Sequence, residues 1–173
     1  MTHSTAAVRV PTFGQVDELP QTLIMSVPDS YLDINHHMNI RHYLAVHDRA
    51  FGYLFTAMGF GSDYIKGRGL SFFQVENHIR YLAEAHGGDE ISVHVRLIGR
   101  TARAIHGVSF LLNRSRGTVA NTLEFLMLHV DLRTRKAVDF DTRSTELLDR
   151  RMADDSVTTW PAPLSGCVHL KRP

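Results

Sequence analysis

The part of the sequence best suited to chemistry is residues 33–39, which read Asp-Ile-Asn-His-His-Met-Asn. They place a carboxylate, carboxamides and imidazoles directly before a segment with helical periodicity. The first backbone N–H groups of a helix have no acceptor within the helix and favour an anion. A carboxylate beside them can activate water while the N–H groups hold a developing oxyanion, as an ester or thioester hydrolase requires. One hypothesis is therefore that Asp33 activates water and that free backbone N–H groups near residues 38–41 stabilise the oxyanion.

A structural role is the commoner explanation for these residues taken alone. Asp33 or Asn35 can simply cap the helix, because both residue types are preferred at that position. Neighbouring histidines in a loop are usually solvated, and the spacing of His36 and His37 does not select a metal. We expect no metal here, and the residues alone leave capping and catalysis open.

The elements that position this segment follow from hydrophobic periodicity. Residues 21–27 have the composition of a short strand, and residues 40–58 form the only long helical pattern. Its apolar face repeats at spacings of three and four through Ile40, Tyr43, Leu44, His47, Phe51, Leu54, Phe55 and Met58. Gly59 and Gly61 end the helix. His47 lies within this face, where a core or interface role is commoner than a ligand role.

Four strands follow the helix, at residues 70–83, 91–97, 105–113 and 119–131. Strict alternation in the first places Phe73 on one face with Asn77, Ile79 and Tyr81. A short helix follows over residues 144–152. A run of strands after a helix favours an α+β fold with an antiparallel sheet, which can curl around the apolar face of the helix.

Composition limits the possible functions. The 173 residues carry 19 Lys and Arg against 18 Asp and Glu, a net charge of +1, which lacks the basic footprint of a nucleic-acid-binding protein. The single cysteine excludes an internal disulfide framework. No segment is apolar enough to span a membrane and no secretory signal is evident, so we expect a cytoplasmic protein. We expect an N-terminal arm at residues 1–20, one domain at 21–152 and a tail at 153–173.

The reactive segment also resembles a known family. The motif D-x-N-x-H-x-N-x-x-x-Y is formed by Asp33, Asn35, His37, Asn39 and Tyr43. It is similar to the signature of hotdog-fold acyl thioesterases of the 4-hydroxybenzoyl-CoA thioesterase and acyl-ACP thioesterase type. Residues 73–82 and 88–90 resemble the family's second strand and following turn. Residues 123–131 resemble a subgroup associated with carnitine breakdown, which is thought to act on betainyl-CoA.

The resemblance, which covers residues 21–140, implies a hotdog fold, a curved antiparallel sheet around one helix. It further implies a homodimer or dimer of dimers with active sites at the subunit interface, acting on an acyl-CoA without a cofactor. By this resemblance Asp33 is the general base or nucleophile, Asn35 and His37 orient water and substrate, and Asn39 and Tyr43 shape the helix start. His36 departs from the family, because many relatives carry glycine there, and it must adopt a backbone conformation that glycine would ease.

The substrate-binding residues are expected to be Asn39, Tyr43, Phe73, Glu76 and His78. Glu76 and His78 share a strand face that could equally lie at a dimer seam or in solvent. For a small cationic acyl group such as betaine, aromatic faces and a carboxylate are the suitable partners. The candidate faces are Tyr43, Phe73 and Tyr81, and the candidate carboxylates are Glu76 and Glu124.

Two other functions remain as alternatives. A hotdog hydratase acting on a double bond also uses Asp, Asn and His, but in that group the spacing resembles D-x-N-x-x-H, and His37 comes one residue too early. A noncatalytic acyl-CoA-binding module would keep the fold without needing Asp33.

Overall fold

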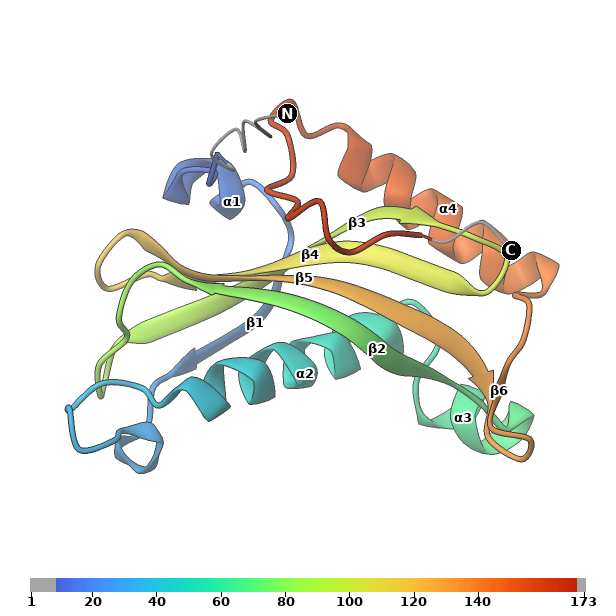
Figure 1. The fold of residues 1–173 in the computed structure, drawn as a ribbon, viewed down its shortest axis with the longest axis horizontal. Coiled ribbons are helices and arrows are strands. Elements are labelled where there is room, and N and C mark those ends of the chain that lie inside the picture. The colour runs from blue at the N-terminus through green and yellow to red at the C-terminus, as the bar shows by residue number, and fades with distance from the viewer. Residues whose placement is uncertain (1–8, 171–173) are drawn as a thin grey trace, which may run out of the picture.

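The computed structural model describes residues 9–170 (Figure 1). The long helix and the strands of the sheet lie where the sequence predicts them. In chain order the elements are α1 (Phe13–Asp17), β1 (Gln21–Ser26), the 3-10 turn η1 (Asp29–Tyr31), α2 (Ile40–Ala57), α3 (Ser62–Arg68), β2 (Leu70–Tyr81), β3 (Glu90–Arg100), β4 (Ala104–Asn113), β5 (Thr118–Asp131), β6 (Lys136–Ala137) and α4 (Thr142–Ser156). The sequence pattern does not predict α1, α3 or β6, which are short.

The strands form one antiparallel sheet in the order β1-β3-β4-β5-β2, with β6 added to β5. The sheet curls around α2, which lies along its concave face, while α1, α4 and the C-terminal segment lie on the convex face (Figure 1). This α+β arrangement confirms the expected hotdog fold. The edges of the sheet are β1 and β2, and β2 is the longer at 12 residues against six.

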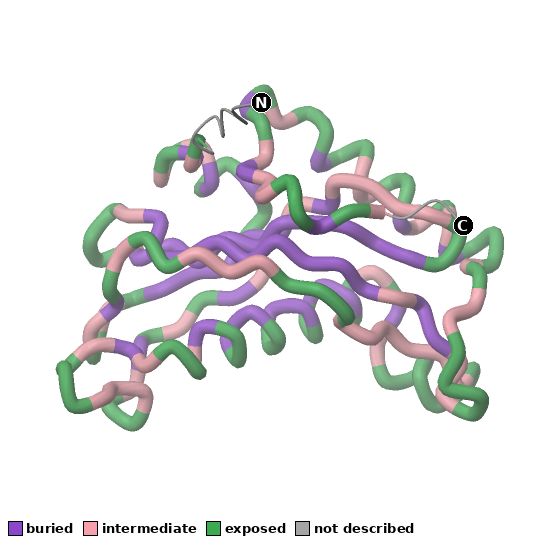
Figure 2. Tube along the Cα trace, viewed as in Figure 1, coloured by how far each residue is buried: buried purple, intermediate pink, exposed green. Residues whose placement is uncertain are grey.

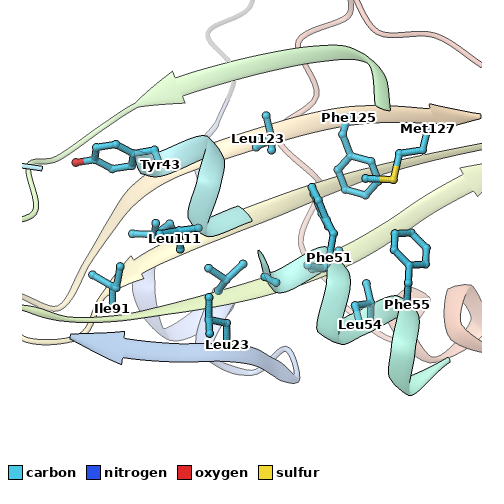
Figure 3. Packing of buried hydrophobic residues seen from close by; sticks show 14 of the residues in the cluster. Leu23, Tyr43, Phe51, Leu54, Phe55, Ile91, Leu111, Leu123, Phe125 and Met127 are labelled. Carbon is cyan, nitrogen blue, oxygen red and sulfur yellow. The ribbon is translucent and has the colours of Figure 1, made fainter. Parts of the chain in front are cut away.

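The core lies between α2 and the concave face of the sheet (Figures 2 and 3). The buried residues of α2 are Tyr43, Val46, His47, Ala50, Phe51, Leu54 and Phe55. The expected face was therefore wrong at Ile40 and Leu44, which are 64% and 43% exposed. The sheet covers only one side of α2. Ile40 and Leu44 lie outside the covered side, so their side chains border solvent.

Strand β2 contains a bulge that corrects the predicted alternation. Gln74 pairs with Met127 but Glu76 pairs with Leu126, so Val75 is the extra residue. One extra residue reverses the faces of everything beyond it. Asn77 thus shares the concave face with Phe72 and Gln74, while Phe73 lies on the convex face. The expectation that Phe73 shares a face with Asn77 was wrong for this reason.

The convex face is covered by the terminal segments. Helix α4 is longer than expected, and its Asp155 accepts the Leu97 N–H of β3 at 2.8 Å. Beyond α4 the chain has no regular element up to residue 170, yet Trp160 is buried and packs edge-on against Phe110 of β4. Parts of the predicted arm and tail, residues 1–8 and 171–173, lie outside the described residues. Within residues 9–170, none of the helices combines the length and apolar character needed to cross a bilayer.

Candidate active site

The segment between η1 and α2 is a tight turn that carries Asp33. The Asp33 N–H donates to the His37 carbonyl at 3.1 Å, and the His36 N–H donates to the Asp33 carbonyl at 3.0 Å. His36 closes the turn with φ +63°, the left-handed region that side chains other than glycine adopt at a cost. The structure thus confirms that this position requires a conformation that glycine would ease.

The Asp33 carboxylate uses one oxygen to hold the turn. Its Oδ1 accepts the Asn35 N–H at 2.8 Å, while Oδ2 lies 4.0 Å from Nδ1 of His37. That second distance is too long for a direct hydrogen bond. The side chain of Asp33 is 20% exposed, so the carboxylate is shielded but reaches solvent. Oδ2 therefore has the capacity to accept a proton from a water molecule.

The start of α2 is capped by Asn39. Its Oδ1 accepts the Arg41 N–H at 3.2 Å, so neither Asp33 nor Asn35 is the cap. The Met38 N–H donates to Ala85 at 2.7 Å and the Asn39 N–H donates to Tyr31 at 2.9 Å. Of the free N–H groups expected near residues 38–41, those of Met38, Asn39 and Arg41 are therefore engaged. Among the hydrogen bonds of the described residues, only the Ile40 N–H of this stretch has no acceptor.

A second wall of the site comes from the turn between β2 and β3. His37 pairs with His86 as an isolated β-bridge, and Nε2 of His37 lies 4.0 Å from Oε1 of Glu84. Oε2 of Glu84 lies 3.7 Å from Nε2 of His86. The sequence pattern does not indicate Glu84 as a site residue, and it predicts His86 only as part of a turn. No local spacing could have revealed them, because they reach His37 through the fold rather than along the chain.

This second turn is fixed by Asp89. Its Oδ2 accepts the His86 N–H at 2.9 Å, Nδ2 of Asn113 at 2.7 Å and Nε of Arg116 at 2.8 Å. Burial alone would raise the pKa of Asp89, but its hydrogen bonds, led by that from Arg116, hold the pKa below its ordinary value. The charged carboxylate thus fastens the turn that carries Glu84 and His86.

Tyr43 of α2 contacts the end of β2 and the turn that follows it. It is 3% exposed, and its ring meets that of Tyr81 edge-on with the ring centres 5.2 Å apart. Burial raises the pKa of the Tyr43 hydroxyl, and a hydrogen bond with the backbone of Ala85 opposes that rise. The structure thus brings Asp33, His37, Asn39 and Tyr43 together around the start of α2, with Asn35 exposed in the same turn.

The structure does not bring the other predicted substrate residues to this loop. Glu76 and His78 pair with Leu126 and Glu124, all on the convex face. Phe73 lies on that face as well, near the start of β2, whereas Tyr81 is at its other end. The Arg135 guanidinium lies over the Phe73 ring, 4.5 Å from its centre. Their role in binding stays a prediction.

Glu124, considered for a cationic substrate, is buried on the convex face. Its Oε1 lies 2.9 Å from Nε2 of His106, and its Oε2 accepts the Ser165 N–H at 2.7 Å. Burial would raise the pKa of Glu124, but the hydrogen bonds from Ser165 and His106 lower it below the ordinary value. The carboxylate is 2% exposed and fully engaged, so it has no access to a substrate at the Asp33 loop.

The sequence matches the thioesterase-like superfamily over residues 27–150, a span that contains α2, the Asp33 loop and every strand of the sheet except β1. The chain belongs to this superfamily. It is 33% identical over 129 residues to the L-carnitine dehydrogenase/betainyl-CoA thioesterase of Agrobacterium fabrum, covering 75% of this chain and 26% of that protein. It is 27% identical over 111 residues to the betainyl-CoA thioesterase of Pseudomonas aeruginosa, covering 64% of this chain and 70% of that protein.

A solved structure has the same fold. A hypothetical protein of Staphylococcus aureus in complex with CoA superposes with a TM-score of 0.78 at 20% identity, over 88% of this chain and 97% of that one. This likeness concerns the fold alone. The chain spans about a quarter of the length of the bifunctional relative from Agrobacterium fabrum.

Proposed function

We propose that this superfamily member is an acyl-CoA thioesterase that hydrolyses a small acyl-CoA to the free acid and CoA. The observation that carries the proposal is the Asp33 carboxylate, with one free oxygen, in the turn that leads to the start of α2. Names of relatives with up to 33% identity support the same reaction. The N-terminus of a helix of 18 residues adds a favourable field for an oxyanion.

In this reaction Oδ2 of Asp33 accepts a proton from water as the water oxygen attacks the thioester carbonyl carbon. The carbonyl oxygen becomes an oxyanion, and the Ile40 N–H at the helix start donates to it. The tetrahedral intermediate then collapses, the carbon–sulfur bond breaks, and the protonated Asp33 returns its proton to the departing thiolate. The carboxylate is regenerated, so no cofactor is consumed.

The neighbouring residues receive supporting roles. His37 faces Oδ2 of Asp33 and orients the attacking water, and Asn35 holds the other carboxylate oxygen through its backbone N–H. Asn39 and Tyr43 bind substrate and shape the helix start. Glu84 joins this group as a positioning residue, because its carboxylate lies between the rings of His37 and His86.

The alternatives have less support. A double-bond hydratase requires the histidine one residue later than His37, and a noncatalytic module would not need a partly free carboxylate at Asp33. The curated relatives carry thioesterase names, which again favours hydrolysis.

We infer that the protein is a homodimer through β2, and a dimer of dimers is the larger form of the same assembly. The free edge of β2 is 12 residues long and exposes Val75 and Tyr81, at 50% and 47%. A long free edge with apolar side chains pairs readily with another strand. Sedimentation at micromolar concentration tests this, and a stable, active monomer would contradict it. The cytoplasmic location stays a prediction.

For the acyl group we propose a small cationic one, of the betaine type. The support is the name of the relatives from Agrobacterium fabrum and Pseudomonas aeruginosa, together with the resemblance in residues 123–131. The test is release of free thiol from betainyl-, acetyl-, benzoyl- and palmitoyl-CoA. The highest kcat/KM is expected for betainyl-CoA. A preference for palmitoyl-CoA would contradict the small acyl group, and no release from any substrate would contradict the thioesterase.

A further inference from the structure

A groove of about 370 Å³ opens between the C-terminal half of α2 and the start of β2. Four of its lining residues are aromatic, and Phe55 and Phe72 are stacked with ring centres 4.5 Å apart (Figure 3 shows Phe51 and Phe55). Asp48 and Gln74 add polar groups to the rim. We call this feature the Asp48 groove.

Asp48 is an exposed carboxylate without a protein cation. No hydrogen bond or ion pair joins its side chain to another residue in the range 9–170, although the neighbouring Arg49 is held by Tyr53. A carboxylate beside aromatic faces is the environment that a quaternary ammonium group favours, because ring faces and the carboxylate both attract the cation. The groove thus has the chemistry that a cationic acyl group requires.

Gly52 keeps the groove open. It lies one turn beyond Asp48 in the interior of α2, where glycine is the least favourable residue after proline. A Cβ at this position would meet no atom of residues 9–170 within 4 Å, so packing within that part of the chain does not require glycine. The free space beside Gly52 is therefore available to something outside this chain.

The groove is too far from the Asp33 loop of its own subunit to serve that loop. Asp48 lies eight residues beyond Ile40, about 12 Å along the helix axis, and Phe55 lies about 22 Å along it. In a betainyl thioester the ammonium nitrogen is two bonds from the carbonyl carbon. A group this short cannot reach from the Asp33 loop to the Asp48 groove within one subunit.

Pairing of β2 with a second β2 brings the two features together. Strand β2 runs antiparallel to α2, because Tyr81 meets Tyr43 at one end and Phe72 meets Phe55 at the other. A two-fold axis through the middle of β2 places the Tyr81 end of each strand beside the Phe72 end of its twin. The Asp33 loop of one subunit then lies at the Asp48 groove of the other.

We propose that the Asp48 groove binds the cationic acyl group of a thioester whose carbonyl is attacked at the Asp33 loop of the other subunit. Asp48 is the residue that selects the cation, and the aromatic lining of the groove contacts its methyl groups. This assignment rests on the proposed thioesterase activity and on the β2 dimer. It names a specificity residue that the motif around Asp33 does not contain.

The first test compares betainyl-CoA with 3,3-dimethylbutanoyl-CoA, which has the same shape but carbon in place of the charged nitrogen. Wild type is expected to prefer the cation, and Asp48→Asn is expected to lower the ratio of the two kcat/KM values about tenfold. Asp154→Asn, an exposed position on α4, is the matched control and should leave the ratio unchanged. An unchanged ratio in Asp48→Asn, or hydrolysis by wild type without preference for the cation, would overturn the cation subsite and leave the thioesterase standing.

The second test asks whether the groove acts across subunits. Co-expressed Asp33→Asn and Asp48→Asn chains, carrying different affinity tags, give purified mixed dimers. If the site is shared, one of the two sites in each mixed dimer has both carboxylates, so the substrate ratio returns to the wild-type value with half the sites active. If Asp33 and Asp48 served the same subunit's site, the ratio would stay at the Asp48→Asn value, and that result would overturn the proposal. Absence of turnover in wild type would instead remove the proposed function itself.

Discussion

Two groups of polar side chains lie near α2 and differ in whether their hydrogen-bonding atoms are paired. Around the Asp33 loop, Oδ2 of Asp33 and Nε2 of His37 have no hydrogen-bond partner among residues 9–170, and both side chains reach solvent. In the core, His47 bonds Ser109 through Nδ1 and Asn121 through Nε2, both at 2.7 Å, and all three residues are fully buried. The comparison teaches that residue type does not decide between chemistry and structure. Free hydrogen-bonding capacity with access to water decides it.

The hydrogen bonds of the core group assign each proton. Nδ2 of Asn121 donates to the Arg80 carbonyl at 2.9 Å, so Oδ1 is the atom that accepts from Nε2–H of His47. Nδ1 of His47 then accepts the Ser109 hydroxyl proton. Nδ1 carries no proton near neutral pH, because burial lowers the pKa of His47 to about 4 and the ring is neutral there. Every polar atom of this ring is used to fix α2 on the sheet.

The largest expected effect is at the Asp33 loop. Asp33→Asn removes the base, and kcat for betainyl-CoA should fall about 10²–10⁴-fold, the usual contribution of general acid–base catalysis. The free energy of unfolding should change little, because the asparagine oxygen can still accept the Asn35 N–H. Thiol-release kinetics and thermal unfolding measure both quantities. Near-normal turnover in an active preparation would contradict the role of Asp33.

The reverse pattern is expected in the core group. His47→Ala leaves Ser109 and Asn121 without partners and opens a cavity, which should lower the free energy of unfolding by about 3–5 kcal/mol. The kcat per folded molecule should remain close to wild type, because His47 touches no reacting group. Urea unfolding and active-site titration separate the two effects. A His47→Ala protein with unchanged stability and reduced kcat would contradict the structural role of His47.

Acid should destabilise the protein partly through His47, because burial lowers the pKa of His47 as it lowers those of His94 and His129. The folded-state pKa of His47, about 4, lies below its ordinary value of 6.5. As pH falls through this window the unfolded chain takes up a proton that the folded protein refuses, so stability present above pH 6.5 is lost, by about 3 kcal/mol in total.

His47→Gln is the control for this window, since its amide can replace both hydrogen bonds without titrating. Its stability should stay flatter from pH 6.5 to 4 than that of wild type. Glu124, whose pKa is lowered from 4.5, contributes a loss only below that value. Chemical unfolding at a series of pH values gives the two windows. An equal slope in both proteins between pH 6.5 and 4 would exclude His47 as its source.

The smallest effect concerns the strained turn. His36→Gly relieves the positive φ but frees the unfolded chain, so we expect a net change in the free energy of unfolding of about 0 to +1 kcal/mol. His36→Val should lower it by about 1–2 kcal/mol, because a β-branched residue fits the left-handed region poorly. Thermal unfolding of the pair measures the difference. A valine variant as stable as the glycine variant would show that the turn relaxes.

Several features were predictable because they depend on local pattern. The period of α2, the alternation in β3 and the turn residues at 87–89 each reflect forces between near neighbours in the chain. Prediction failed where the outcome depends on contacts between segments that are distant in the sequence. The bulge at Val75 reversed the face of Phe73, and the sheet left Ile40 and Leu44 outside the core although they match the helical period.

The sequence by itself determined the order of the elements and the position of the reactive turn, because hydrophobic periodicity and cap chemistry act over a few residues. Only the tertiary structure decided which polar groups remained free for chemistry. It placed Glu84 and His86 beside His37, and it buried Glu124 in hydrogen bonds with His106 and Ser165. It also gave both ring nitrogens of His47 hydrogen-bond partners. Hydrogen-bond partners from distant strands and the extent of burial set these outcomes, and neither is encoded in the spacing of residues along the chain.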